Sequence, residues 1–165
     1  MKARQLQTVL GSALKVSEAE MVQRFQKLRD INLLPVSRGR NAEYINSDAV
    51  VSGLLSIIDE RPGFAGMTAK TLRVLRPVGS ADSAFAKATT FADALRALLD
   101  SEASLDALIE IRISNSEIYT NSYGRGAIFY WDGDMDRVSY YVGATAASLL
   151  QPGKQVEYDP NDLIS

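Results

Sequence analysis

Apolar side chains in the first 14 residues recur at the spacing of a helix. Over residues 3–14, short polar stretches separate apolar positions that lie three or four residues apart. These apolar positions are Leu6, Val9, Leu10 and Leu14. Gly11 lowers the helix propensity only slightly, so the segment predicts a helix that buries one side.

A second helix is expected after a turn of about three residues. Ser17 and Glu20 match a capping box, in which the two side chains satisfy free amides at the start of a helix. The apolar face of this helix consists of Met21 or Val22, followed by Phe25, Leu28 and Ile31. Two helices joined by so short a turn predict a helix-turn-helix arrangement.

A short hairpin and a third helix are predicted next. Two apolar segments, 33–36 and 43–45, flank a Ser-Arg-Gly-Arg-Asn tip, whose glycine and last asparagine tolerate the positive φ of tight turns. Asn46 or Ser47 then caps a helix over residues 48–58. Its apolar stripe is Val50, Val51, Leu54, Leu55 and Ile58. Helix, helix, hairpin and helix, in this order, predict a winged helix-turn-helix domain over residues 1–60.

The rest of the chain predicts a different architecture. Proline and glycines interrupt the pattern after residue 60, so residues 61–80 are expected to be a linker with a short helix over 68–75. Residues 82–100 are rich in alanine and leucine and predict a helix capped by Asp82. Strand patterns follow at 107–113, 118–123, 127–131 and 138–142. A further helical turn is expected over residues 144–150.

These elements predict an α+β fold. The second domain, residues 81–150, would be a helix packed on an antiparallel meander of three or four strands. Residues 151–165 would form a loosely held C-terminal tail. The meander carries many aromatic residues, and we interpret them as sheet core or as a surface for protein partners.

Charge is distributed unevenly between the two halves. Residues 1–76 hold 12 Lys and Arg against 7 Asp and Glu, whereas residues 77–165 hold 6 against 13. The net charge of −2 therefore hides a basic first half and an acidic second half. Such asymmetry suggests a part that binds a polyanion, joined to a part with another role.

Composition excludes several classes of site. The chain has no histidine, which removes the commonest general base and zinc ligand, and no cysteine, which excludes disulfides and thiolate metal sites. No nucleotide-binding glycine motif occurs, and Asp132–Asp136 lacks the later residues of a calcium loop. We therefore expect no catalytic residue, cofactor or metal. No apolar run is long enough to span a membrane, so a cytoplasmic location is expected.

The second helix offers candidate contacts to DNA bases. In a helix-turn-helix protein this helix enters the major groove, where glutamine can pair with adenine and arginine with guanine. The candidate residues of the turn and helix are Lys15, Ser17, Gln23, Arg24 and Lys27. Glu18 and Glu20 would repel phosphate, so an ordinary solvated helix face is the alternative interpretation.

The hairpin tip offers candidate contacts to the DNA backbone. Arg38, Gly39, Arg40 and Asn41 place two guanidinium groups around a glycine that lets the chain approach closely. Such a tip can reach a phosphate or lie in a minor groove. The alternative is a basic surface turn. The tip follows the second helix by a few residues, which is where a wing is expected. Lys2 and Arg4 would add backbone contacts near the first helix.

The sequence LQTVLGSALKVSEAEMVQRFQKLRDINLLPVSRGRNAEYINSDAVVSGLL resembles the winged helix-turn-helix modules of bacterial and phage transcription regulators. Within it, KVSEAEMVQRFQKLRDINLLP is similar to a turn, a recognition helix and a closing L-R-x-x-x-L-L-P pattern. The resemblance covers about the first third of the chain. It implies a regulator that binds double-stranded DNA as a dimer or higher oligomer.

Three functions follow from these observations. The first is a non-enzymatic, sequence-specific regulator whose C-terminal domain forms a homodimer or higher homo-oligomer, with the transcription machinery as a further partner. The second is a phage-type DNA-packaging recognition subunit, which would form rings. The third is a protein-interaction or inhibitor module that binds no DNA and uses the acidic half.

Overall fold

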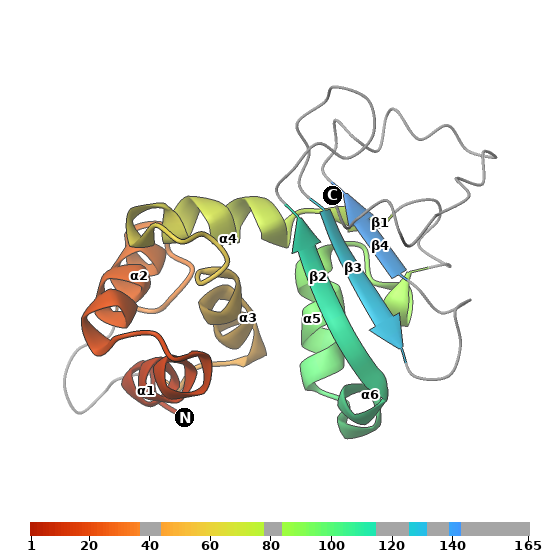
Figure 1. The fold of residues 1–165 in the computed structure, drawn as a ribbon, viewed down its shortest axis with the longest axis horizontal. Coiled ribbons are helices and arrows are strands. Elements are labelled where there is room, and N and C mark those ends of the chain that lie inside the picture. Colours follow the sequence, from red (N-terminus) through yellow and green to blue (C-terminus); the bar gives the residue numbers. More distant parts are fainter. Residues whose placement is uncertain (37–43, 78–83, 115–125, 132–138, 143–165) are drawn as a thin grey trace.

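The structure is a computed structural model that describes residues 1–36, 44–77, 84–114, 126–131 and 139–142. These residues form an α+β fold, as the sequence predicts (Figure 1). A group of helices from the first half lies beside an antiparallel sheet that is backed by a helix from the second half. No helix among the described residues is both long and apolar enough to cross a membrane.

The first two helices lie where the sequence places them. Helix α1 spans Ala3–Leu14 and helix α2 spans Glu18–Asp30. Lys15 adopts a left-handed φ of 55° and ends α1, which leaves a turn of three residues before α2. The Ser17 hydroxyl accepts a hydrogen bond from the Glu20 amide at 3.2 Å, so the predicted N-cap is confirmed.

The buried faces of α1 and α2 differ in part from the predicted stripes. The predicted residues that are buried are Leu6, Leu10, Met21, Phe25 and Leu28. The predicted residues that lie at the surface instead are Val9, Leu14 and Ile31, and of the alternatives Met21 and Val22 the exposed one is Val22. Gln7 and Gly11 are buried beside Leu6 and Leu10, so α1 is rotated toward these two positions and away from Val9.

Helix α3 spans Ser47–Leu55 and ends earlier than predicted. Asn46 caps it, because its side-chain oxygen accepts a hydrogen bond from the Ala49 amide at 2.9 Å. Val51 and Leu55 are fully buried, but Ile58 lies beyond the helix and is 44% exposed. The Ser56 carbonyl faces a side chain of α2 instead of continuing the helix.

Residues 62–77, predicted as part of a linker with a short helix, do contain that helix and pack into the fold. A 3₁₀ turn, η2 (Pro62–Phe64), leads into helix α4 (Ala65–Arg73) and then into strand β1 (Arg76–Pro77). The apolar residues that this segment buries are Ala65, Ala69, Leu72 and Leu75. Gly66 permits close contact with α2, since a Cβ placed there would lie 2.7 Å from the Lys27 carbonyl oxygen.

The helix predicted over residues 82–100 forms only in its second half. Helix α5 spans Phe91–Leu99, and the Thr90 hydroxyl caps it by accepting from the Asp93 amide at 3.2 Å. Before it, a 3₁₀ turn, η4 (Phe85–Lys87), has left-handed φ values at Ala86 and Lys87, which a continuous helix cannot contain. The predicted cap, Asp82, lies outside the described residues.

A short helix that the sequence pattern did not indicate, α6 (Glu102–Ala107), leads into the sheet. The strands β2 (Leu108–Ser114), β3 (Gly126–Trp131) and β4 (Ser139–Val142) form the predicted meander. Strand β1 adds a fourth, antiparallel strand beside β4, giving the order β1-β4-β3-β2. The predicted elements at 118–123 and 144–150, and the tail 151–165, lie outside the described residues.

Aromatic side chains fill the space between α5 and the sheet. Phe129 and Tyr141 are fully buried, and the Phe91 ring of α5 lies 5.5 Å from each of their ring centroids. Phe85 packs against Trp131 with a centroid distance of 4.7 Å and the rings tilted by 33°. For these aromatic residues, the interpretation as sheet core is confirmed.

The two predicted domains share one hydrophobic core. The Phe91 amide of α5 donates to the Leu75 carbonyl oxygen at 2.8 Å, directly after α4. Arg73 of α4 pairs with Asp48 of α3 at 2.6 Å, and Ser47 donates to Asp100 at 2.9 Å. Buried apolar residues run without a break from α1 to β4, so the two halves form one packed unit.

Candidate nucleic-acid interface

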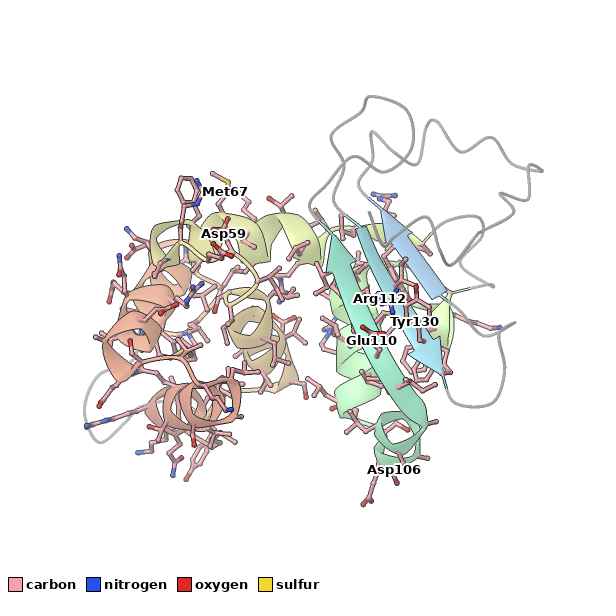
Figure 2. The ribbon with its side chains drawn as sticks, in the orientation of Figure 1. Asp59, Met67, Asp106, Glu110, Arg112 and Tyr130 are labelled. Atoms are coloured by element: carbon pink, nitrogen blue, oxygen red, sulfur yellow. The ribbon has the colours of Figure 1, made fainter. Side chains whose placement is uncertain are left out.

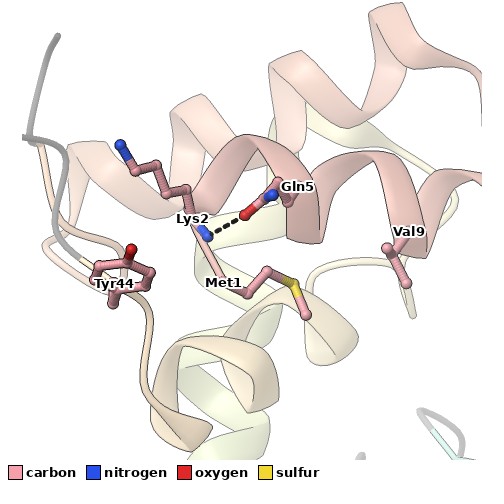
Figure 3. A pocket seen from close by; sticks show the side chains of 5 residues that line it. All are labelled: Met1, Lys2, Gln5, Val9 and Tyr44. Carbon is pink, nitrogen blue, oxygen red and sulfur yellow. Dashed lines mark hydrogen bonds between the residues drawn. The ribbon is translucent and has the colours of Figure 1, made fainter. Parts of the chain in front are cut away.

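Tyr44 directly follows the segment that carries Arg38 and Arg40, and it lies at the start of α1. Its backbone forms an isolated antiparallel bridge with Lys2, and the Ile45 amide donates to the Met1 carbonyl oxygen at 3.0 Å. The backbone amide of Lys2 in turn donates to the Gln5 side chain at 2.7 Å (Figure 3). The chain that leaves the basic segment is therefore fixed to the first turn of α1.

A shallow, open pocket lies at this junction (Figure 3). Its lining residues are Met1, Lys2, Gln5, Val9 and Tyr44. Tyr44 is 76% exposed although its backbone is paired with Lys2. An exposed ring beside a lysine is a surface that can lie against a sugar or base while the ammonium reaches a phosphate.

Basic residues lie at both ends of α1. Lys2 and the exposed Arg4 are at its start, and the exposed Lys15 is in the turn at its end. The two ends of this 12-residue helix are about 18 Å apart. Lys15 therefore lies near Ser17 at the start of α2, whereas Lys2 and Arg4 lie at the other end of α1, near Tyr44. The structure places the cations in two groups along one helix.

The other predicted contact residues in and just before α2 differ in how accessible their polar groups are to a partner. Gln23 is exposed and can form hydrogen bonds with a partner. Lys27 is 43% exposed and lies 3.8 Å from the Asp30 carboxylate, a weak surface pair that leaves its ammonium accessible. Ser17 is exposed, but its hydroxyl already serves as the N-cap. Glu18 and Ala19 are also exposed near the start of the helix, so this surface is not strongly basic.

The prediction that Arg24 contacts bases is wrong, because its side chain is only 2% exposed. Nη1 donates to the carbonyl oxygens of Ser56 at 2.5 Å and Asp59 at 2.8 Å, and Nη2 donates to that of Glu60 at 3.2 Å. The guanidinium also pairs with the Glu20 carboxylate at 2.6 Å. Arg24 therefore connects α2 to the end of α3.

The role of Glu20 changes with that of Arg24. As a surface carboxylate it would repel phosphate, but its charge is balanced by a buried guanidinium one helical turn away. Its side chain is 32% exposed and does not complete the capping box. Glu18 is then the unpaired carboxylate at the start of α2 among the described residues.

Arg38, Gly39, Arg40 and Asn41 lie outside the described residues. Of the flanking segments, residues 33–36 contain no strand and Tyr44 pairs with Lys2, so the predicted pairing of these two segments as a hairpin is wrong. The structure thus brings Lys15 together with Ser17, and Lys2 together with Tyr44, and it removes Arg24 from the surface.

Tyr44 is the site residue that sequence reasoning missed. It follows the basic tip in the chain, but a single tyrosine after a polar loop gives no pattern that distinguishes it from a core residue. The described part of the chain contains no cluster of three or more acidic side chains that could hold a metal ion. No protein-family model, curated protein or solved structure matches this chain.

Proposed function

We propose that residues 1–60 form a winged helix-turn-helix that binds double-stranded DNA, and that the protein is a sequence-specific transcription regulator of the cytoplasm. The observation that supports this most is the bridge between Tyr44 and Lys2. It joins the chain that follows Arg38 and Arg40 to the start of α1, where Lys2 and Arg4 lie. In this proposal Lys2 and Arg4 contact phosphates at the start of α1, and Arg38 and Arg40 contribute further phosphate contacts.

In this proposal α2 is the recognition helix. Gln23 and Lys27 are accessible polar side chains of this helix and would contact base edges in the major groove. Lys15, in the turn before α2, would contact a phosphate, as would Lys2 and Arg4. Arg24 would act from within the fold, because it fixes α2 against the carbonyl oxygens after α3.

The proposal also explains why the carboxylates of α2 are compatible with DNA. Glu20 forms an ion pair with Arg24, so its charge is largely compensated inside the protein. Phosphate contacts dominate affinity in such complexes, and these would come from α1 and the basic segment instead of from the start of α2. Glu18 would remain near a base edge, where a carboxylate can accept from cytosine N4.

Selection from a library of randomised duplexes tests the proposal. The full chain is incubated with the library at low salt, the bound duplexes are recovered over several rounds, and they are sequenced. Enrichment of a shared short sequence is expected, and a Gln23→Ala variant should enrich an altered sequence while retaining duplexes in general. Recovery of duplexes without any shared sequence would contradict sequence-specific regulation, and failure to retain duplexes would contradict DNA binding altogether.

A further inference from the structure

The outer side of α4 carries an apolar strip. Phe64 is 48% exposed, Met67 63% and Val74 62%. At the helical spacing of 100° per residue these three positions fall within one side of the helix, opposite the buried Ala69 and Leu72. Figure 2 shows Met67 at the outer side of α4. We call Phe64, Met67 and Val74 the α4 strip.

Basic side chains border the α4 strip. Lys70 on the same side of the helix and Arg76 just after it are exposed, and neither forms an ion pair with another described residue. The Arg61 guanidinium lies 4.2 Å from the centroid of the Phe64 ring. It also pairs with Asp59 at 3.2 Å, so its charge is partly compensated. Among the described residues, Lys70 and Arg76 therefore place two unpaired positive charges beside the strip.

A second apolar surface lies on α6 and the start of β2. Leu105 is 41% exposed and Ile109 is 63% exposed. The pairing of β2 with β3 shifts register between Leu108 and Glu110, and such a bulge turns a side chain out of the regular alternation. That shift accounts for the exposure of Ile109 on a strand whose other isoleucines, Ile111 and Ile113, are partly buried against the core. We call Leu105 and Ile109 the α6 patch.

Acidic side chains border the α6 patch. Glu102 and Asp106 are exposed, and neither forms an ion pair among the described residues. Glu110, the third carboxylate, pairs with Arg112 at 3.0 Å. The two apolar surfaces therefore carry borders of opposite charge, the arrangement that selects one partner surface over others.

We propose that the protein self-associates head to tail, with the α4 strip of one copy docked on the α6 patch of the next. The two surfaces cannot meet within one molecule, because α4 and α6 lie at opposite ends of the fold, as Met67 and Asp106 show in Figure 2. Contact between two different surfaces of identical chains is heterologous, and it closes into a ring or continues as a filament. It leaves α1 and α2, and hence the proposed DNA surface, outside the interface.

The partner of each surface is a second copy of this chain. The chain itself carries both an apolar surface with basic neighbours and an apolar surface with acidic neighbours. Exposed apolar side chains that gather into a patch rimmed by polar residues mark interaction sites. Covering each surface with the other removes both from water in every copy of a closed ring. This proposal does not depend on DNA binding, and it is tested without DNA.

Sedimentation equilibrium over a range of protein concentrations tests the proposal with two variants. Met67→Glu places a carboxylate in the α4 strip, and Ile109→Lys places an ammonium in the α6 patch. The wild-type chain is expected to form species larger than a monomer, whereas each variant alone should remain a monomer at the highest concentration measured for wild type. Val22→Glu is the matched control, since Val22 is 49% exposed on α2 and should leave assembly unchanged.

Mixing the two variants identifies the interface as heterologous. The Met67→Glu chain keeps its α6 patch and the Ile109→Lys chain keeps its α4 strip, so an equimolar mixture should form a dimer that cannot extend. Val74→Glu and Leu105→Lys serve as a second pair, and circular dichroism establishes that each variant is folded. A monomeric wild type, variants that assemble like wild type, or a mixture that stays monomeric would each overturn the proposal.

Discussion

Nη1 of Arg24 donates to the carbonyl oxygen of Ser56 over 2.5 Å, across a separation of 32 residues in the sequence. Arg24 is buried near the middle of α2, and Ser56 ends α3. The same guanidinium binds the carbonyl oxygens of Asp59 and Glu60, which follow α3. One side chain therefore supplies hydrogen-bond donors to three carbonyl oxygens in the segment that follows α3.

Replacing Arg24 is expected to destabilise the whole fold. An Arg24→Met variant keeps much of the side-chain volume but leaves buried carbonyl oxygens and the Glu20 carboxylate without their donor. Hydrogen bonds to charged groups contribute about 1.5–3 kcal/mol each, so a loss of about 3 kcal/mol or more in the free energy of unfolding is expected. Urea unfolding measures it. The neighbouring Gln23→Met is the control and should change stability by less than about 0.5 kcal/mol. Equal stability of the two variants would show that Arg24 has no structural role.

Gly66 provides a second test of packing within the helical group. A Cβ at this position would lie 2.7 Å from the Lys27 carbonyl oxygen, so Gly66→Ala must push α4 away from α2. Overpacking of this kind costs about 1–3 kcal/mol, and the better helix propensity of alanine offsets up to about 1 kcal/mol of it. A lower unfolding midpoint is expected. Gly63→Ala is the matched control, because no atom lies within 4 Å of its added Cβ. A stabilised Gly66→Ala variant would contradict the close contact.

Tyr141 makes stability depend on pH in the alkaline range. Burial raises the pKa of its phenol from 10.0 to about 12, against a smaller opposing effect of the Phe85 backbone, whose geometry falls short of a hydrogen bond. Because the folded state holds this proton more tightly than the unfolded state, stability is unaffected below pH 10 and falls as the pH rises from 10 towards 12. The loss from this residue is about 2 kcal/mol at pH 12.

A Tyr141→Phe variant isolates that contribution. The hydroxyl has no hydrogen-bond partner among the described residues, so its removal should leave stability near pH 8 unchanged or slightly higher. Urea unfolding of both proteins from pH 8 to pH 12 gives the comparison. The variant should lose less stability than wild type above pH 10. Parallel losses in the two proteins would show that Tyr141 ionises as readily in the fold as in the unfolded chain.

The sequence predicted most helices and strands correctly because their patterns are local. Apolar spacing and capping residues such as Ser17 and Asn46 are visible in any short window. The role of Arg24 could not be predicted in this way, since its partners lie 32 to 36 residues away and are backbone atoms. An arginine is almost never fully buried unless it is paired, so its position on the helix gave no sign that Arg24 is buried.

Strand β1 and the break before α5 were missed for similar reasons. A two-residue strand that contains Pro77 has no periodicity to detect, and it exists only because β4 pairs with it. The alanine-rich residues before Phe91 have high helix propensity, yet Ala86 and Lys87 adopt left-handed conformations while Phe85 packs on Trp131. Tertiary packing overrides local propensity at this point.

Charge reversal at the start of α1 tests the described part of the proposed DNA surface. Arg4→Glu should weaken binding to duplex DNA and lower the salt dependence, because it removes a phosphate contact and adds repulsion. Lys87→Glu is the control, since Lys87 is exposed in η4 of the second half and its substitution makes the same change in net charge. Fluorescence anisotropy with a labelled duplex measures both. Equal weakening by the two variants would indicate an effect of net charge alone.

The most direct test of DNA binding through the basic segment is the salt dependence of affinity for an Arg38→Ala, Arg40→Ala double variant beside the wild-type chain. Each phosphate contact contributes about −0.9 to the slope of log K against log salt concentration. The proposal predicts that wild type binds duplex DNA at low salt, and that the double variant binds more weakly with a slope smaller in magnitude by about 1.8. An unchanged affinity and slope, or a wild-type chain that binds no duplex at low salt, would contradict it.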